Sequence, residues 1–310
     1  MQAPSIRIGT RGSPLALAQA HEVRDRLAKA HDISHDAISI TVIKTFGDQV
    51  LDRPLSDIGG KGLFTKEIED ALLANEIDVA VHSMKDMQTA LPDGLTIGAV
   101  LPREDVRDAF ISLKYGTLDA LPKGAIVGTS SLRRQAQLLY VRPDLNVVGF
   151  RGNVQTRLKK LQEGVADATF LAVAGLKRLG LEDRITAPIP VEQMLPAVAQ
   201  GAIGLEIRAG DTKMAGIIAP LNDTATALAV TTERAFLGRL EGSCRTPIAG
   251  LAYLAHGKLV FNGQVLSPNG RKAYSVMRDG LAEHAADIGL SAADEVLAKA
   301  DPAALVRPGA

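Results

Sequence analysis

The sequence has little of what marks several large classes of protein. Among its 310 residues it has one cysteine and no tryptophan, and aromatic residues make up only 4%. A single cysteine excludes an intrachain disulfide and a zinc site built from several cysteines. The shortage of aromatic side chains argues against a surface on which nucleic-acid bases stack.

An excess of charge and long apolar runs are absent too. The 35 Lys and Arg residues equal the 35 Asp and Glu residues in number, which argues against a general nucleic-acid-binding protein. No run of about 18 uncharged apolar residues is present. The first residues, MQAPSIRIGTRG, lack the basic and apolar regions of a secretory signal. We therefore expect a cytoplasmic protein without a nucleic-acid or membrane partner.

What the chain does contain is an alternation of short apolar strands and longer helical segments. With 46% hydrophobic residues, its length suggests two or three domains. The expected strands are 5–10, 37–45, 77–83, 95–101, 109–113, 125–130, 146–150 and 168–175, and the expected helices are 14–30, 62–75, 225–240, 291–300 and two that begin near 132 and 154. This alternation predicts parallel sheets with helices on both faces. The pattern of 250–267 instead predicts antiparallel strands.

Two segments punctuated by proline, 101–104 and 195–201, lie between these periodic stretches. They are candidates for crossings of the chain between domains, and the alternative is that they are ordinary loops.

Positive charge is concentrated between residues 128 and 160. Seven cations face one acid, Asp144, giving a local charge of +6. The cations are Arg133, Arg134, Arg142, Arg151, Arg157, Lys159 and Lys160. Several follow the ends of expected strands, where open α/β sheets bind ligands and where helix N-termini and guanidinium groups attract carboxylates or phosphates. The segment therefore predicts an anion site, and the alternative is a solvated basic helix face.

Two further segments carry reactive side chains. In VHSMKD, Lys85 and Asp86 follow a strand that ends near His82, so Asp86 could move a proton or face a cation. The alternatives are a helix cap or a loop ion pair for Asp86, and a buried core role for His82. In LEGSCRTPIAG the single cysteine, Cys244, precedes Arg245, and a neighbouring cation favours the nucleophilic thiolate. The alternative is a small buried hydrophobic residue.

Eight motifs in this order resemble the porphobilinogen deaminase (hydroxymethylbilane synthase) family over nearly the whole chain. They are IRIGTRGSPLALAQ, GGKGLFTKEIE, VHSMKD, GTSSLRRQAQL, RGNVQTRLKKL, LAVAGLKRLGL, AVAQGAIGLE and LEGSCRTPIAG. The resemblance implies three α/β domains. The first two would be similar to type II periplasmic binding proteins with a cleft between them, and the third would be small with an antiparallel sheet. The implied boundaries are 1–101 plus 202–222, 102–201 and 223–310.

The resemblance also implies an activity. The family joins four porphobilinogen units head to tail, each losing ammonia, on a dipyrromethane cofactor held by a cysteine thioether, and then releases hydroxymethylbilane for tetrapyrrole and haem synthesis. Asp86 would be catalytic. The matching cofactor-binding residues are Cys244, Lys85, Arg133, Arg134, Ser131 and Thr129, and the substrate-binding residues are Arg11, Ser13, Arg151, Arg157, Arg178 and Gln200. We expect no metal and a monomer.

Two positions depart from the family pattern. Gln88 replaces a proline after the catalytic segment, which frees one φ angle and adds a backbone donor. Ser243 replaces the second glycine of Gly-Gly-Cys, and serine would be strained if that position requires a positive φ. The competing interpretation of the whole chain is a non-catalytic module with a type II binding-protein fold that captures an organic anion.

Overall fold

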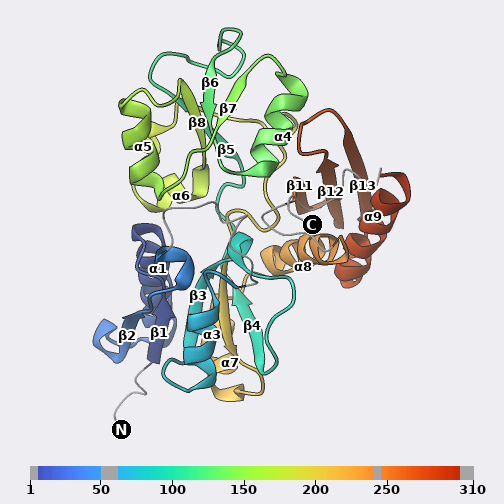
Figure 1. Ribbon diagram of the computed structural model, residues 1–310. Coiled ribbons are helices and arrows are strands. Elements are labelled where there is room, and N and C mark those ends of the chain that lie inside the picture. The colour runs from blue at the N-terminus through green and yellow to red at the C-terminus, as the bar shows by residue number, and fades with distance from the viewer. Residues whose placement is uncertain (1–5, 50–61, 241–245, 301–310) are drawn as a thin grey trace. The chain divides into compact units, whose positions relative to one another are not determined.

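The computed structural model describes residues 6–49, 62–240 and 246–300 (Figure 1). The chain forms two compact units. One contains Met1–Arg103 and Ala202–Ala227, and the other contains Glu104–Gly201 and Leu228–Ala310. The division into three domains stays a prediction. None of the helices formed by the described residues combines the length and apolar character needed to span a bilayer.

The first unit is built on a five-stranded sheet in the order β2-β1-β3-β10-β4. Its strands are β1 (Ile6–Thr10), β2 (Ile38–Val42), β3 (Val79–Ser83), β4 (Leu95–Val100) and β10 (Ile203–Arg208). β1 pairs in parallel with β2 and β3, whereas β10 is antiparallel to β3 and β4. The prediction of a purely parallel sheet is therefore wrong. The difference is due to β10, a strand distant in sequence that lies between β3 and β4 and runs in the opposite direction.

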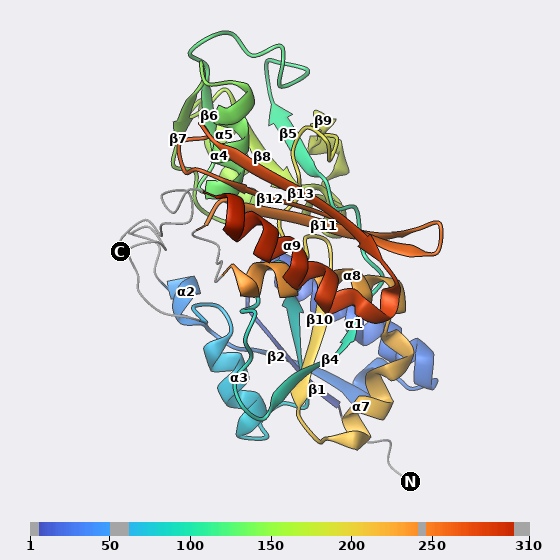
Figure 2. The same ribbon diagram turned by 90° about the vertical axis from the view of Figure 1, so that its right-hand side faces the viewer.

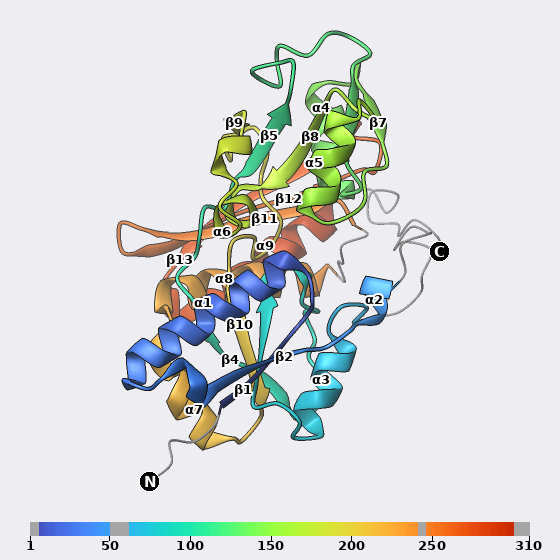
Figure 3. The same cartoon turned by 90° about the vertical axis from the view of Figure 1, so that its left-hand side faces the viewer.

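Helix α1 (Pro14–His31) begins where the sequence indicates. Ser13 accepts a hydrogen bond from the Ala16 amide, and proline occupies the first helical position. Ala20, Val23 and Leu27 pack into the core of the first sheet, along which Figure 3 shows α1 lying. The remaining helical elements of this unit are α2 (Phe46–Gln49), α3 (Lys66–Leu73), α7 (Thr212–Ile218) and short 3-10 turns at His35–Ala37, Met84–Asp86 and Ala219–Leu221.

The second unit repeats the same strand arrangement, in the order β7-β6-β8-β5-β9. Its strands are β5 (Asp108–Ser112), β6 (Ile126–Gly128), β7 (Asn146–Val148), β8 (Ala168–Ala172) and β9 (Ala187–Pro188). β6 is parallel to β7 and β8, and β5 is antiparallel to β8 and β9. Each sheet thus has the same sequence of strand directions, although the amino-acid sequence shows no repeat of fixed period.

The helices of this sheet are α4 (Leu132–Val141), α5 (Val154–Gln162) and α6 (Val173–Arg178), with a 3-10 turn at Glu182–Arg184. The segment 168–175 does not form one strand as expected, because the chain turns into α6 after Ala172. Two rings, Phe110 and Phe170, lie 6.3 Å apart in the core beneath α4.

A separate antiparallel sheet consists of β11 (Ile248–Ala255), β12 (Lys258–Leu266) and β13 (Ala273–Gly280). Helices α8 (Thr224–Arg239) and α9 (Ala285–Lys299) pack with it, and Figure 2 shows α9 lying along the sheet. α9 begins at Ala285, earlier than expected, after a 3-10 turn at Ala282–His284. This sheet and the two mixed sheets confirm the predicted α/β class.

Candidate functional site

The arginine pair Arg133 and Arg134 lies in the first turn of α4, which directly follows β6. Ser131 caps this helix, because its hydroxyl accepts a hydrogen bond from the Arg134 amide at 3.4 Å. The hydroxyl of Thr129 accepts a hydrogen bond from the Ser131 amide at 3.2 Å. The strand–turn–helix transition therefore places four of the predicted cofactor-binding residues together.

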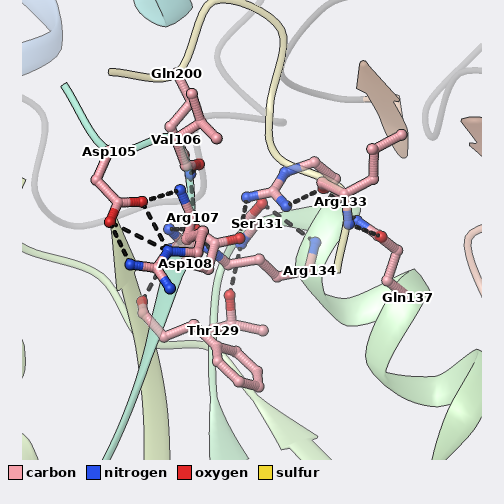
Figure 4. Close-up of polar contacts among 12 residues, drawn as sticks. Asp105, Val106, Arg107, Asp108, Thr129, Ser131, Arg133, Arg134, Gln137 and Gln200 are labelled. Carbon is pink, nitrogen blue, oxygen red and sulfur yellow. Dashed lines mark hydrogen bonds and ion pairs between the residues drawn. The ribbon is translucent and has the colours of Figure 1, made fainter. Parts of the chain in front are cut away.

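Both guanidinium groups contact one carboxylate, Asp108, at the start of β5 (Figure 4). Arg133 Nη2 donates to Asp108 Oδ2 at 2.8 Å, and Arg134 Nη2 and Nε donate to Asp108 Oδ1 at 2.7 and 3.2 Å. Asp108 is fully buried, and each arginine is 5% exposed. Burial alone would raise the pKa of the Asp108 carboxyl, but the charges and hydrogen bonds of the two arginines outweigh it and hold that pKa well below its usual range.

Main-chain carbonyls fix the same two side chains from other directions. Arg133 Nη1 donates to the Leu195 carbonyl at 2.8 Å, and Arg134 Nη1 donates to the Phe170 carbonyl at 2.9 Å. Gln200, 1% exposed, donates through Nε2 to Asp108 Oδ1 at 3.0 Å and to the Val106 carbonyl at 2.8 Å. The predicted substrate residue Gln200 thus belongs to the network around Asp108.

Sequence reasoning missed Asp108. The charge count covered residues 128–160, whereas the counter-charge of Arg133 and Arg134 lies about 25 positions earlier in the chain. A signal was available, because Asp108 is an acid at the entrance of the apolar strand DAFIS, and buried acids are ordinarily paired.

Arg151 and Arg157 lie in the connection from β7 to α5 and in α5 itself, and both are half-buried. Arg157 Nε donates to the Gly152 carbonyl at 2.9 Å, and Lys160 Nζ donates to the Arg151 carbonyl at 3.0 Å. Gly152 has φ +119°, and a Cβ there would meet Thr156 at 2.6 Å, so only glycine fits this turn.

The other cations of the basic segment have different positions. Lys159 is exposed and lies 3.7 Å from Glu163, as expected for a solvated helix face. Arg142 pairs with Asp144 at 2.7 Å. Outside this segment, Arg178 at the end of α6 donates from Nη2 to the Gly201 carbonyl at 3.0 Å.

In the first unit, Lys85 and Asp86 form a 3-10 turn with Met84 immediately after β3. The Met84 amide donates to the Ala202 carbonyl at 3.0 Å, and the buried Met84 side chain anchors the turn. Asp86 is exposed and Lys85 is half-buried. The carboxylate and the ammonium group therefore follow a buried strand end directly.

His82, which lies in β3 two residues before this turn, is buried, and its Nε2 lies 3.0 Å from Glu206 Oε2 on β10. The interpretation of His82 as a buried side chain with a partner is therefore confirmed. Beside it, Ser83 exchanges hydrogen bonds of 2.8 and 3.0 Å with Gln19 of α1. These contacts tie the end of β3 to its neighbours.

The Met84 side chain packs against Gly204, so a larger residue at position 204 should lower stability. A Cβ at Gly204 would lie 2.0 Å from Met84 Sδ. Gly204→Ala should therefore overpack the core and lower the free energy of unfolding by about 1–3 kcal/mol, measured by urea denaturation. Gly216→Ala in α7 is the matched control, because no atom lies within 4 Å of its Cβ position and alanine favours helix. Equal stability of the Gly204 variant and the parent would contradict this packing argument.

Arg11 and Ser13 follow β1. The Arg11 guanidinium lies 4.2 Å from the centre of the Phe64 ring, and Ser13 serves as the cap of α1. Phe64 itself precedes α3, which begins later than expected. The side chain of Gln88 stands near Gly62, where an added Cβ would lie 2.7 Å from Gln88 Nε2.

Cys244 and Ser243 lie outside the described residues. Within residues 6–49, 62–240 and 246–300, no cluster of three or more metal-ligating side chains could hold a metal ion. The side chains that donate to Asp108 are two guanidinium groups and the Gln200 amide, and guanidinium groups suit a carboxylate-bearing cofactor.

Comparisons with known proteins agree on one family. Residues 6–216 match the family described as "Porphobilinogen deaminase, dipyromethane cofactor binding domain", and residues 227–298 match its C-terminal domain. The porphobilinogen deaminase of Paracoccus denitrificans is 60% identical over 95% of this chain and 94% of its own length. The chloroplastic porphobilinogen deaminase of Oryza sativa is 55% identical over 96% of this chain and 84% of its own length.

Solved structures of binding proteins are more distantly similar. An ABC-transporter substrate-binding protein from Coxiella burnetii is 15% identical with a TM-score of 0.42, covering 70% of this chain and 91% of its own. The methionine binding protein MetQ is 11% identical with a TM-score of 0.43, covering 70% and 89%. At these scores the likeness carries no conclusion about function. The matches over nearly the whole chain show instead that it belongs to the porphobilinogen deaminase family.

Proposed function

We propose that this chain joins four porphobilinogen units head to tail on a covalent dipyrromethane primer, with loss of one ammonia per unit, and that water then releases hydroxymethylbilane. The observation that carries the proposal is the buried arginine pair at the start of α4, which lies within the region matching the cofactor-binding family. Porphobilinogen has an acetate and a propionate side chain, so each added ring brings two carboxylates that need cationic partners.

The cofactor, when bound, supplies the pyrrole carbon to which the first substrate is joined. Cys244 would hold it through a thioether. Its carboxylates and pyrrole rings would be bound through charge and hydrogen bonds by Lys85, Thr129, Ser131, Arg133 and Arg134. The residues that would bind substrate and growing chain are Arg11, Ser13, Arg151, Arg157, Arg178 and Gln200.

Asp86 would perform the proton chemistry. Loss of ammonia from porphobilinogen leaves an electron-poor carbon, and the attacking pyrrole becomes transiently cationic. A carboxylate near the pyrrole N–H groups stabilises that cation and helps ammonia depart as a protonated leaving group. The exposed position of Asp86 on a turn fixed by Met84 suits a group that must meet a substrate.

Mass spectrometry of the purified chain, combined with an ammonia assay, tests this proposal. We expect the intact mass to exceed the sequence mass by two pyrrole units, and we expect porphobilinogen to be consumed with equimolar release of ammonia. A chain at its sequence mass that binds porphobilinogen without releasing ammonia would instead be the non-catalytic anion-binding module. The cytoplasmic location and the monomeric state stay predictions.

A further inference from the structure

The arginine pair has more hydrogen-bond donors than its contacts use. A guanidinium group carries five N–H groups. Among the described residues, Arg133 donates two hydrogen bonds and Arg134 donates three. Half of the guanidinium N–H groups of the pair therefore donate no hydrogen bond to the described residues.

The charges of the network are also unequal among the residues that the structure describes. Two guanidinium groups share the single negative charge of Asp108, although each arginine is 5% exposed. The nearby Arg107 does not change this balance, because it pairs with its own acid, Asp105, at 2.6 Å. An excess positive charge in so buried a place is costly unless an anion joins it. Within the described parts of the chain, the ion pairs of the network therefore join two positive charges to one negative charge.

Asp108 is itself held rigidly. It begins β5 and pairs with Ala172 of β8, and its carbonyl accepts a hydrogen bond from the Ile189 amide at 2.8 Å. Its carboxylate is fixed by donors from α4 and from Gln200. A rigid anchor of this kind sets the plane of each guanidinium before a ligand arrives.

We propose that Asp108 is a positioning residue of the cofactor site: it orients Arg133 and Arg134 so that their remaining donors take one carboxylate group of the dipyrromethane cofactor. This inference rests on the proposed function. It makes the Asp108 carboxylate a support for cofactor binding and not a competitor that the cofactor carboxylates must displace.

The test follows cofactor loading by intact mass. Chains are produced in cells that make no porphobilinogen, incubated with porphobilinogen at 15 °C, and sampled over time for the mass gain of two pyrrole units. Asp108→Asn should load at least tenfold more slowly than the parent. Asp105→Asn is the matched control, since it removes the charge of a neighbouring acid whose carboxylate pairs with Arg107, and it should load at the parental rate.

A second control separates positioning from general stability. Phe110→Leu removes packing from the same strand and leaves Asp108 and its hydrogen-bond donors unchanged in identity, and it should lower the Tm while loading at the parental rate at 15 °C. Asp108→Glu keeps the charge but moves it by one methylene, so it should load at least fivefold more slowly than the parent even where Asp108→Asn fails to fold.

Three results would overturn the proposal. They are parental loading of Asp108→Asn or Asp108→Glu, faster loading of Asp108→Asn, and equally slow loading of a Phe110→Leu chain with a matched Tm. Faster loading would make Asp108 a competitor of the cofactor. If the parent itself gains no mass, the proposed function fails as well. If the parent and Asp105→Asn gain the expected mass, one of the three results above contradicts only the role of Asp108.

Discussion

Cys244→Ser should abolish turnover and leave the purified chain at its sequence mass, with the fold retained. A serine hydroxyl is a far weaker nucleophile than a thiolate at neutral pH, and the adjacent Arg245 favours the thiolate. Intact mass, far-ultraviolet circular dichroism and release of ammonia from porphobilinogen measure the three parts of this result. Because Cys244 lies outside the described residues, the prediction depends on the motif LEGSCRTPIAG and on family membership.

Ser243→Gly is the matched control for this loop. It restores the residue usual in the family beside the cysteine and leaves the thiol in place, so the chain should still carry the cofactor. Normal turnover by an unmodified Cys244→Ser chain would show that no thioether at this position is needed.

Asp86→Asn should lower kcat at least about 10²-fold, which corresponds to about 2.7 kcal/mol of transition-state stabilisation. The amide keeps the size of the side chain and removes its charge and its ability to take up a proton. Since Asp86 is exposed, the fold should be unaffected, and the mass should show that the cofactor is still attached. Steady-state turnover of the loaded variant measures the effect.

Asp93→Asn is the control for Asp86→Asn. Asp93 is another exposed acid of the same unit, in the turn before β4, and it has no place in the site. It should retain the parental kcat. A kcat within about threefold of the parent for Asp86→Asn would mean that the carboxylate does not carry the proton chemistry.

Many helix and strand positions could be predicted because they depend on interactions between residues that are near one another in the sequence. Ser13 and Pro14 mark the start of α1, and Ser131 marks the start of α4, since capping and the fixed φ of proline act within one turn. Strands such as β3 follow from short apolar runs. Local signals failed where an apolar segment contains both a strand and a helix. At Ala172 the strand β8 ends and α6 follows directly, with no polar residue between them to mark the boundary.

By itself, the sequence determined the α/β class, most of the strands and helices and the family, because caps, apolar periodicity and motifs are properties of neighbouring residues. Only the tertiary structure decided that β10 runs antiparallel within the first sheet and that Asp108 receives both Arg133 and Arg134. Strand pairing and the burial of a charge join residues far apart in the chain. Their energies depend on which groups meet in space, and no local count of charges contains that information.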